Sequence, residues 1–163
     1  MWIDKTGHSC VLYSFAIITG REPEQLIRLL GHDGSEVIYT DLPAPYCRRA
    51  FHPQEVMSVL YRLGFAFATL EFEWVLRVDE GHALRHKIDC RDYNVVRRIQ
   101  SSQGVMAGRA PNGQPHAIAL NYGSVIDPNG TTYPYLTFTP QVYYELVAGP
   151  NVAFRPRSAA PGA

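Results

Sequence analysis

The sequence predicts a single α+β domain, with N-terminal helices packed on an antiparallel sheet formed mainly by the C-terminal half. Helix-like apolar spacing fills the first part of the chain, whereas after residue 103 short apolar runs alternate with turn sequences. Helices followed by strands are typical of the α+β class. The chain has 163 residues, of which 46% are hydrophobic and 18% charged, which is enough for a substantial core.

A central helix is expected at residues 10–19, with the sequence CVLYSFAIIT, because apolar side chains occur on all its faces. A helix of this kind is buried on every side. Ser9 before it is a good N-cap, and Gly20 after it is a good C-terminal stop. The Ile-Ile-Thr at its end also favours a strand, which is the alternative for this segment.

The other elements of the first half follow from apolar spacing and from the proline and glycine residues at their ends. They are a helix within residues 21–30, a loop over 32–50 with a short strand at 37–40, a helix from Pro53 to Gly64, and a strand over 65–73. Residues 76–91 are polar and ambiguous.

The second half is read in the same way, with turns at 111–114, 122–123 and 128–130. The expected elements are a helix capped by Asp92, strands over 104–110, 116–121 and 124–127, a short helix over 142–146 capped at 139–140, and a strand at 152–154. The last residues, 156–163, predict a disordered tail, so the domain is expected to cover 1–155.

Charge and composition narrow the classes of partner. Fifteen basic and fifteen acidic side chains cancel, so the overall charge does not favour nucleic acid or an anionic membrane. No apolar run approaches the about 20 residues that cross a bilayer. The N-terminus lacks the basic-then-apolar pattern of a secretory signal. We therefore expect a cytoplasmic protein, with delivery into a host cell left open. Nothing here indicates an oligomeric state.

The cysteines point away from a disulfide framework and from zinc. They are Cys10, Cys47 and Cys90, an odd number with no close pair, as in a reducing compartment. His82 and His86 would share a helix face with Asp89 near them, but no third ligand is compelling. We predict no metal site and no other cofactor, and Cys47 and Cys90 are interpreted as structural.

The remaining cysteine lies where a catalytic thiol would. A nucleophilic cysteine needs a stabilised thiolate, a base and a group that orients the base. A helix N-terminus stabilises a thiolate, and Cys10 opens the central helix. His116 begins one predicted strand and Asp127 ends the next, and the turn at 122–123 would bring them together. The pattern predicts Cys10 as nucleophile, His116 as general base and then acid, and Asp127 as its orienting partner.

Each of these residues also has an ordinary structural interpretation. Free cysteine is among the most buried residue types, so Cys10 would then be a small core residue. His116 would be a hydrogen-bonded histidine at a strand end, and Asp127 a turn residue. His8 is better explained as a cap or rim residue than as the base, because positions two apart seldom align for proton transfer. The aromatic residues between 133 and 144 are expected in the core and on the sheet surface, and the lining of a substrate groove is the alternative.

The order of these elements resembles the papain-like cysteine peptidase superfamily. Residues 9–20, SCVLYSFAIITG, resemble its front motif, a cysteine leading an apolar helix that ends in Thr-Gly. Residues 116–128, HAIALNYGSVIDP, resemble its rear motif, a histidine strand followed by a turn and Asp-Pro. The likeness is to the compact branch that includes the bacteriocin-leader peptidases and small phage-encoded relatives. It covers residues 4–30 and 104–130.

This resemblance implies a papain-like fold and a hydrolase acting on peptide, isopeptide or glutamine side-chain amide bonds of a protein or peptide. Many members carry a glutamine six residues before the cysteine, where its amide helps to bind the oxyanion. Asp4 stands there in this chain, and an ionised carboxylate cannot donate a hydrogen bond. A backbone N–H, Thr6 or His8 would then replace it. The alternative is a non-catalytic binding module, a phage or bacterial factor that binds a host protein.

Overall fold

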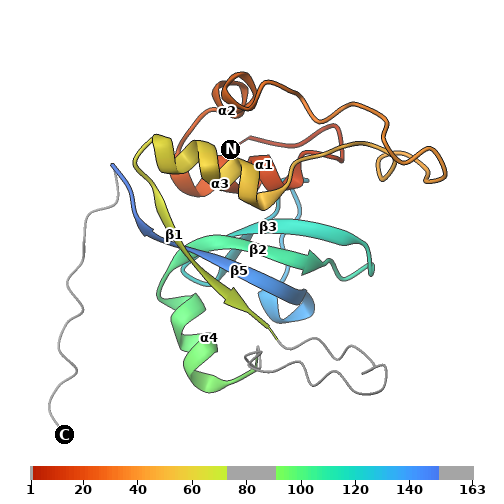
Figure 1. Cartoon of the computed structure of the whole chain (residues 1–163). Coiled ribbons are helices and arrows are strands. Elements are labelled where there is room, and N and C mark those ends of the chain that lie inside the picture. Colours follow the sequence, from red (N-terminus) through yellow and green to blue (C-terminus); the bar gives the residue numbers. More distant parts are fainter. Residues whose placement is uncertain (1, 73–90, 151–163) are drawn as a thin grey trace, which may run out of the picture.

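A computed structural model describes residues 2–72 and 91–150, and its fold is α+β (Figure 1). The helices are α1 (Cys10–Thr19), α2 (Pro23–Leu30), α3 (Pro53–Arg62) and α4 (Tyr93–Gln100), with a short 3₁₀ turn at Tyr135–Thr137. The strands are β1 (Ala66–Glu71), β2 (Gln103–Arg109), β3 (Pro115–Asn121), β4 (Ser124–Ile126) and β5 (Thr139–Ala148). No helix among these is long and apolar enough to cross a bilayer. The expected strand at 152–154, the tail at 156–163 and the His82, His86, Asp89 and Cys90 group lie outside the described residues.

The five strands form one antiparallel sheet in the order β1-β5-β2-β3-β4. Two hairpins join β2 to β3 and β3 to β4. The second turns at Tyr122 and Gly123, whose φ angles of 52° and 83° are those of the mirror-image turns that match strand twist. Helices α1, α2 and α3 lie on one side of the sheet and α4 on the other (Figure 1).

Side chains that alternate along the strands build two cores. On β3, Ala117 and Ala119 join the core shared with α1, α2 and α3, whereas Ile118 and Leu120 join the core shared with α4. The alanines leave room for the bulky helix α1, which packs on β2 and β3. This packing fixes the start of α1 near one end of β3.

The predicted central helix is confirmed, and Gly20 ends it in the left-handed region with a φ of 67°. The helix that follows, the one that starts at Pro53 and the one capped by Asp92 are also confirmed, since the Asp92 carboxylate accepts from the N–H groups of Asn94 and Val95. Ser9 is the N-cap residue of α1, as predicted, but its hydroxyl makes no capping hydrogen bond. The strand expected at 37–40 is reduced to a single bridge between Val37 and Arg48.

The helix expected over residues 142–146 is also wrong. These residues lie in β5, which pairs with β1 on one side and β2 on the other. Their β-branched and aromatic side chains favour a strand, and Tyr143 and Tyr144 enter opposite cores. Pro140 is tolerated because it lies opposite Gly108 at an irregularity of the ladder, where a missing N–H breaks no regular pair.

Candidate active site

Cys10 is the first residue of α1 and is partly exposed. The N–H groups in the first turn of a helix have no acceptor within the helix, and they point out of its N-terminus together with the positive end of the dipole. The thiol and the N–H of Cys10 therefore lie at a position that favours negative charge. What fixes this position is the loop before the helix, residues 4–9.

Asp4 organises that loop. Its Oδ1 accepts from the Thr6 N–H at 2.8 Å, from the Thr6 hydroxyl at 2.6 Å and from the Gly7 N–H at 3.3 Å. Its Oδ2 accepts from the Ser9 N–H at 2.9 Å. The carboxylate is 9% exposed and acts wholly as an acceptor, so it has no donor to offer an oxyanion.

The two replacement donors that the sequence suggested are also engaged. The hydroxyl of Thr6 donates toward Asp4, and the ring of His8 donates from Nε2 to the carbonyl oxygen of Asp33 at 3.3 Å. His8 is thus a rim residue beside the loop. The Cys10 N–H is the donor that this geometry leaves for a developing oxyanion.

The second half of the site is brought up by a backbone hydrogen bond. The Asp4 N–H donates to the carbonyl oxygen of Pro128 at 2.7 Å, which ties the loop before α1 to the turn after β4. In that turn the Gly130 N–H donates to the Asp127 carbonyl oxygen at 2.9 Å. The two segments that carry the nucleophile and the orienting residue are therefore fixed relative to each other.

His116 and Asp127 lie together, as their spacing across the hairpin predicts. His116 Nε2 lies 2.8 Å from Asp127 Oδ1, and the side chains are 16% and 1% exposed. The Cys10 side chain lies beside the same ring and helps to raise the pKa of His116. Since Nε2 is used by Asp127, Nδ1 is the ring nitrogen left for the thiol. The structure thus brings Cys10, His116 and Asp127 into one chain of contacts.

Tyr133, one of the aromatic residues expected in the core or on the sheet surface, belongs to the same chain of contacts. Its hydroxyl donates to Asp127 Oδ2 at 2.7 Å, while the Asn129 N–H donates to Oδ1 at 2.9 Å. The Asp-Pro-Asn-Gly turn signals the backbone contact, because an aspartate often accepts from the N–H two residues on. No local signal indicates the tyrosine, which is six residues away along the chain.

The charges reinforce one another. Burial, the largest effect, disfavours the imidazolium, but hydrogen bonds to Asp127 and Cys10 and their charges outweigh it and raise the pKa of His116 to about 10. Burial likewise opposes ionisation of Asp127, yet donors from His116, Asn129 and Tyr133 hold the pKa of that carboxyl below its usual range. Burial and Asp127 raise the pKa of Tyr133, which stays a neutral donor. At neutral pH His116 is therefore an imidazolium that donates to the Asp127 carboxylate and lies beside Cys10.

Two cavities open beside the site. One of about 220 Å³ is lined by His116, Asp4 and Gly7, by Pro45 and Tyr46 of the 32–50 loop, and by Asn112, Gln114 and Asn129 among others. The other, of about 430 Å³, lies around Thr6, His8, Ser35 and Arg48. Pro45 lines both, so these cavities flank one loop residue.

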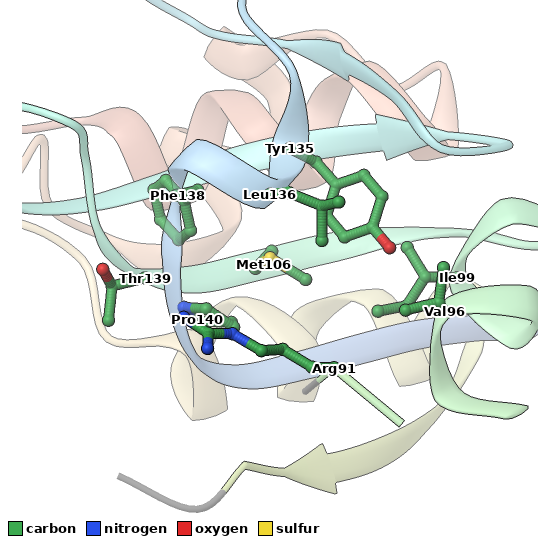
Figure 2. A pocket seen from close by; sticks show the side chains of 9 residues that line it. All are labelled: Arg91, Val96, Ile99, Met106, Tyr135, Leu136, Phe138, Thr139 and Pro140. Atoms are coloured by element: carbon green, nitrogen blue, oxygen red, sulfur yellow. The ribbon is translucent and has the colours of Figure 1, made fainter. Parts of the chain in front are cut away.

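A third cavity, of about 400 Å³, lies away from the triad (Figure 2). It is enclosed by α4, β2 and the segment before β5, and its lining includes Ile99, Met106 and Phe138, all in the core on the α4 side. None of the three triad residues contributes to it. Its lining is mostly apolar, and its polar residues are Arg91, Tyr135 and Thr139.

Within residues 2–72 and 91–150, no three histidine, cysteine, aspartate or glutamate side chains gather as a metal site would require. Comparisons of the chain with protein-family models, curated proteins and solved structures found no match.

Proposed function

We propose that this protein is a cysteine-dependent hydrolase of papain-like fold that cleaves amide bonds of a protein or peptide substrate. One observation carries the proposal: a cysteine at a helix N-terminus contacts a histidine whose far nitrogen is held by a buried carboxylate. This arrangement supplies a nucleophile, a proton carrier and an orienting group in the order that nucleophilic catalysis needs.

In the first half of the reaction, the Cys10 thiolate attacks the carbonyl carbon of the amide, and the carbonyl π electrons move to the oxygen. The Cys10 N–H stabilises that oxyanion. As the oxyanion collapses, the C–N bond breaks and protonated His116 gives its proton to the leaving nitrogen. An amine departs, and the acyl group remains on Cys10 as a thioester.

In the second half, neutral His116 takes a proton from water, and the hydroxide adds to the thioester carbonyl. The C–S bond then breaks, which releases a carboxylic acid and restores the thiolate beside the imidazolium. Asp127 keeps the ring aimed throughout, and Tyr133 keeps Asp127 aimed. The same steps convert a glutamine side chain to glutamate when the leaving amine is ammonia.

The proposal is tested by incubating the protein with a proteome-derived peptide library and identifying new amino termini and new glutamates by mass spectrometry. We expect products from the wild type and from Cys47→Ser, and none from Cys10→Ser or His116→Gln. Brief quenching in acid should trap an acyl group on Cys10. Products that persist in Cys10→Ser would refute the mechanism. No product from any variant, with a partner protein bound equally by wild type and Cys10→Ser, would favour a binding module.

A further inference from the structure

The strongest unexplained surface feature is a run of exposed apolar side chains in the loop between α2 and α3. We call residues 37–46 the apolar loop. Its large apolar residues are between 39% and 55% exposed, and they are Val37, Ile38, Tyr39, Leu42 and Tyr46. Several exposed apolar side chains within one short segment are more typical of an interaction site than single exposed apolar residues are.

The exposure belongs to a fixed backbone. The N–H groups of Ile38 and Tyr39 both donate to the Cys47 carbonyl oxygen, at 2.9 and 3.1 Å, and the Cys47 side chain is buried. At the base of the loop, Arg48 Nη1 donates to the Ser35 carbonyl oxygen at 2.6 Å. The chain is thus held so that apolar side chains face solvent, and a partner would bind there with little ordering of the loop.

The apolar loop adjoins the catalytic residues. Its Pro45 and Tyr46 line the same 220 Å³ cavity as His116. Gly7, three residues before Cys10, packs against Pro45 so closely that a Cβ would lie 3.3 Å from the ring, at a φ of 74°. Figure 1 shows the segment that follows α2 reaching past the helices on the side where the β2–β3 hairpin turns. A ligand that fills the cavity therefore meets the loop.

The position of His116 indicates which part of a substrate would fill this cavity. His116 gives its proton to the leaving nitrogen, so a cavity that His116 lines and Cys10 does not is on the leaving-group side. Asn112, Gln114 and Asn129 line it with carboxamide groups whose N–H donors bond to no other described residue. Neutral amide donors of this kind suit the carbonyl oxygens of an extended peptide backbone.

We infer that the apolar loop docks apolar side chains of a polypeptide substrate on the leaving-group side of the scissile bond. The inference rests on the proposed function and narrows it. An enzyme that releases ammonia from glutamine would use neither the cavity nor the loop for its leaving group. The substrate is therefore a peptide or isopeptide bond whose leaving amine carries a chain with apolar residues.

The test uses Tyr39→Ser/Leu42→Ser in the full chain, with Leu29→Ser/Tyr93→Ser as the matched control. The control removes a leucine and a tyrosine of similar or greater exposure from α2 and α4. Sites cleaved in a proteome-derived peptide library are sequenced. We expect wild type and control to enrich apolar residues on the leaving-group side, and the loop variant to lose this enrichment.

For one long peptide found in this way, we expect kcat/KM to fall by about 10- to 100-fold in the loop variant, as for loss of buried apolar contacts. For the same peptide truncated shortly after the scissile bond, kcat/KM should be equal in the loop variant and the wild type. The rate at which iodoacetamide alkylates Cys10 should also be equal in the two proteins. Three outcomes would overturn the inference and leave the proposed function standing. They are cleavage without apolar enrichment, apolar enrichment that the loop variant retains, and apolar enrichment on the acyl side of the scissile bond.

A wild type that dimerises through the loop, shown by light scattering and lost in the loop variant with cleavage unchanged, would also overturn it. Absence of any Cys10-dependent cleavage would overturn the proposed function, and this inference with it. These outcomes are distinct because the first set requires Cys10-dependent products and the last requires none.

Discussion

Replacing Asp127 by asparagine removes one charge from the site and almost no volume. In the wild type, His116 Nε2 lies 2.8 Å from Asp127 Oδ1. The amide oxygen of an asparagine can still accept from that nitrogen and from the Asn129 N–H. What is lost is the negative charge that helps to raise the pKa of His116 to about 10. The imidazolium becomes less stable, so the pKa of His116 falls.

The size of the effect follows from the hydrogen bond. A bond to a charged group contributes about 1.5–3 kcal/mol, and a neutral one about 0.5–1.5 kcal/mol. Because Asp127 is 1% exposed, water does little to screen the difference. A loss of about 1–2 kcal/mol lowers the equilibrium constant for forming the thiolate–imidazolium pair by about 5- to 30-fold.

The assay is the rate at which iodoacetamide alkylates Cys10 at pH 6, where an ordinary thiol is almost wholly protonated. We expect that rate to fall in Asp127→Asn, by at most the same factor of about 5 to 30. Asp92→Asn is the control, because it makes the same chemical change at the cap of α4 and asparagine caps equally well. A rate in Asp127→Asn equal to that of the wild type and the control would refute the charge-pair reasoning.

Three further predictions follow from the hydrogen bonds around the site. Asp4→Asn should lower the free energy of unfolding, measured by urea denaturation, by about 1–3 kcal/mol and should slow the alkylation of Cys10, because an amide N–H would face the Ser9 N–H. The control Asp33→Asn, at an exposed turn, should have a much smaller effect on both quantities. Tyr133→Phe should lower the free energy of unfolding by about 1.5–3 kcal/mol, because it removes a hydrogen bond to a charged carboxylate. The control Tyr93→Phe should leave it almost unchanged, because the Tyr93 hydroxyl is exposed. Since the pKa of His116 is raised from 6.5 to about 10, its contribution to stability should be complete below pH 6.5 and lost as the pH rises toward 10. The difference in unfolding free energy between wild type and His116→Gln should therefore shrink over that range. A constant or growing difference would contradict the raised pKa of His116.

The parts of the fold that could be predicted are those with strong local signals. The helix that begins at Cys10 and ends at Thr19-Gly20, and the helix capped by Asp92, can each be predicted from a few neighbouring residues. The pairing of His116 with Asp127 was predictable because a two-residue turn at Tyr122-Gly123 fixes the register of a hairpin.

The errors arose where a distant partner decides the structure. Thr139-Pro140 looks like a helix start, but the residues after it complete the sheet between β1 and β2, and that pairing is set by tertiary contacts. Asp4 was interpreted through its spacing from Cys10, whereas its role depends on which N–H groups the loop folds around it. The Tyr133 hydroxyl is linked to Asp127 by the path of the loop between them, which no pattern in the sequence describes.

The central claim is that Cys10, His116 and Asp127 form one charged unit, and NMR titration of the His116 ring tests it most directly. With His116 identified by its absence from the spectrum of His116→Gln, the account predicts a ring that stays protonated through neutral pH and titrates near pH 10. Cys10→Ala should lower that pKa, because the thiol is one of the groups that raise it. A His116 ring that titrates near 6.5 in the wild type, or one that does not respond to loss of Cys10, would contradict the account.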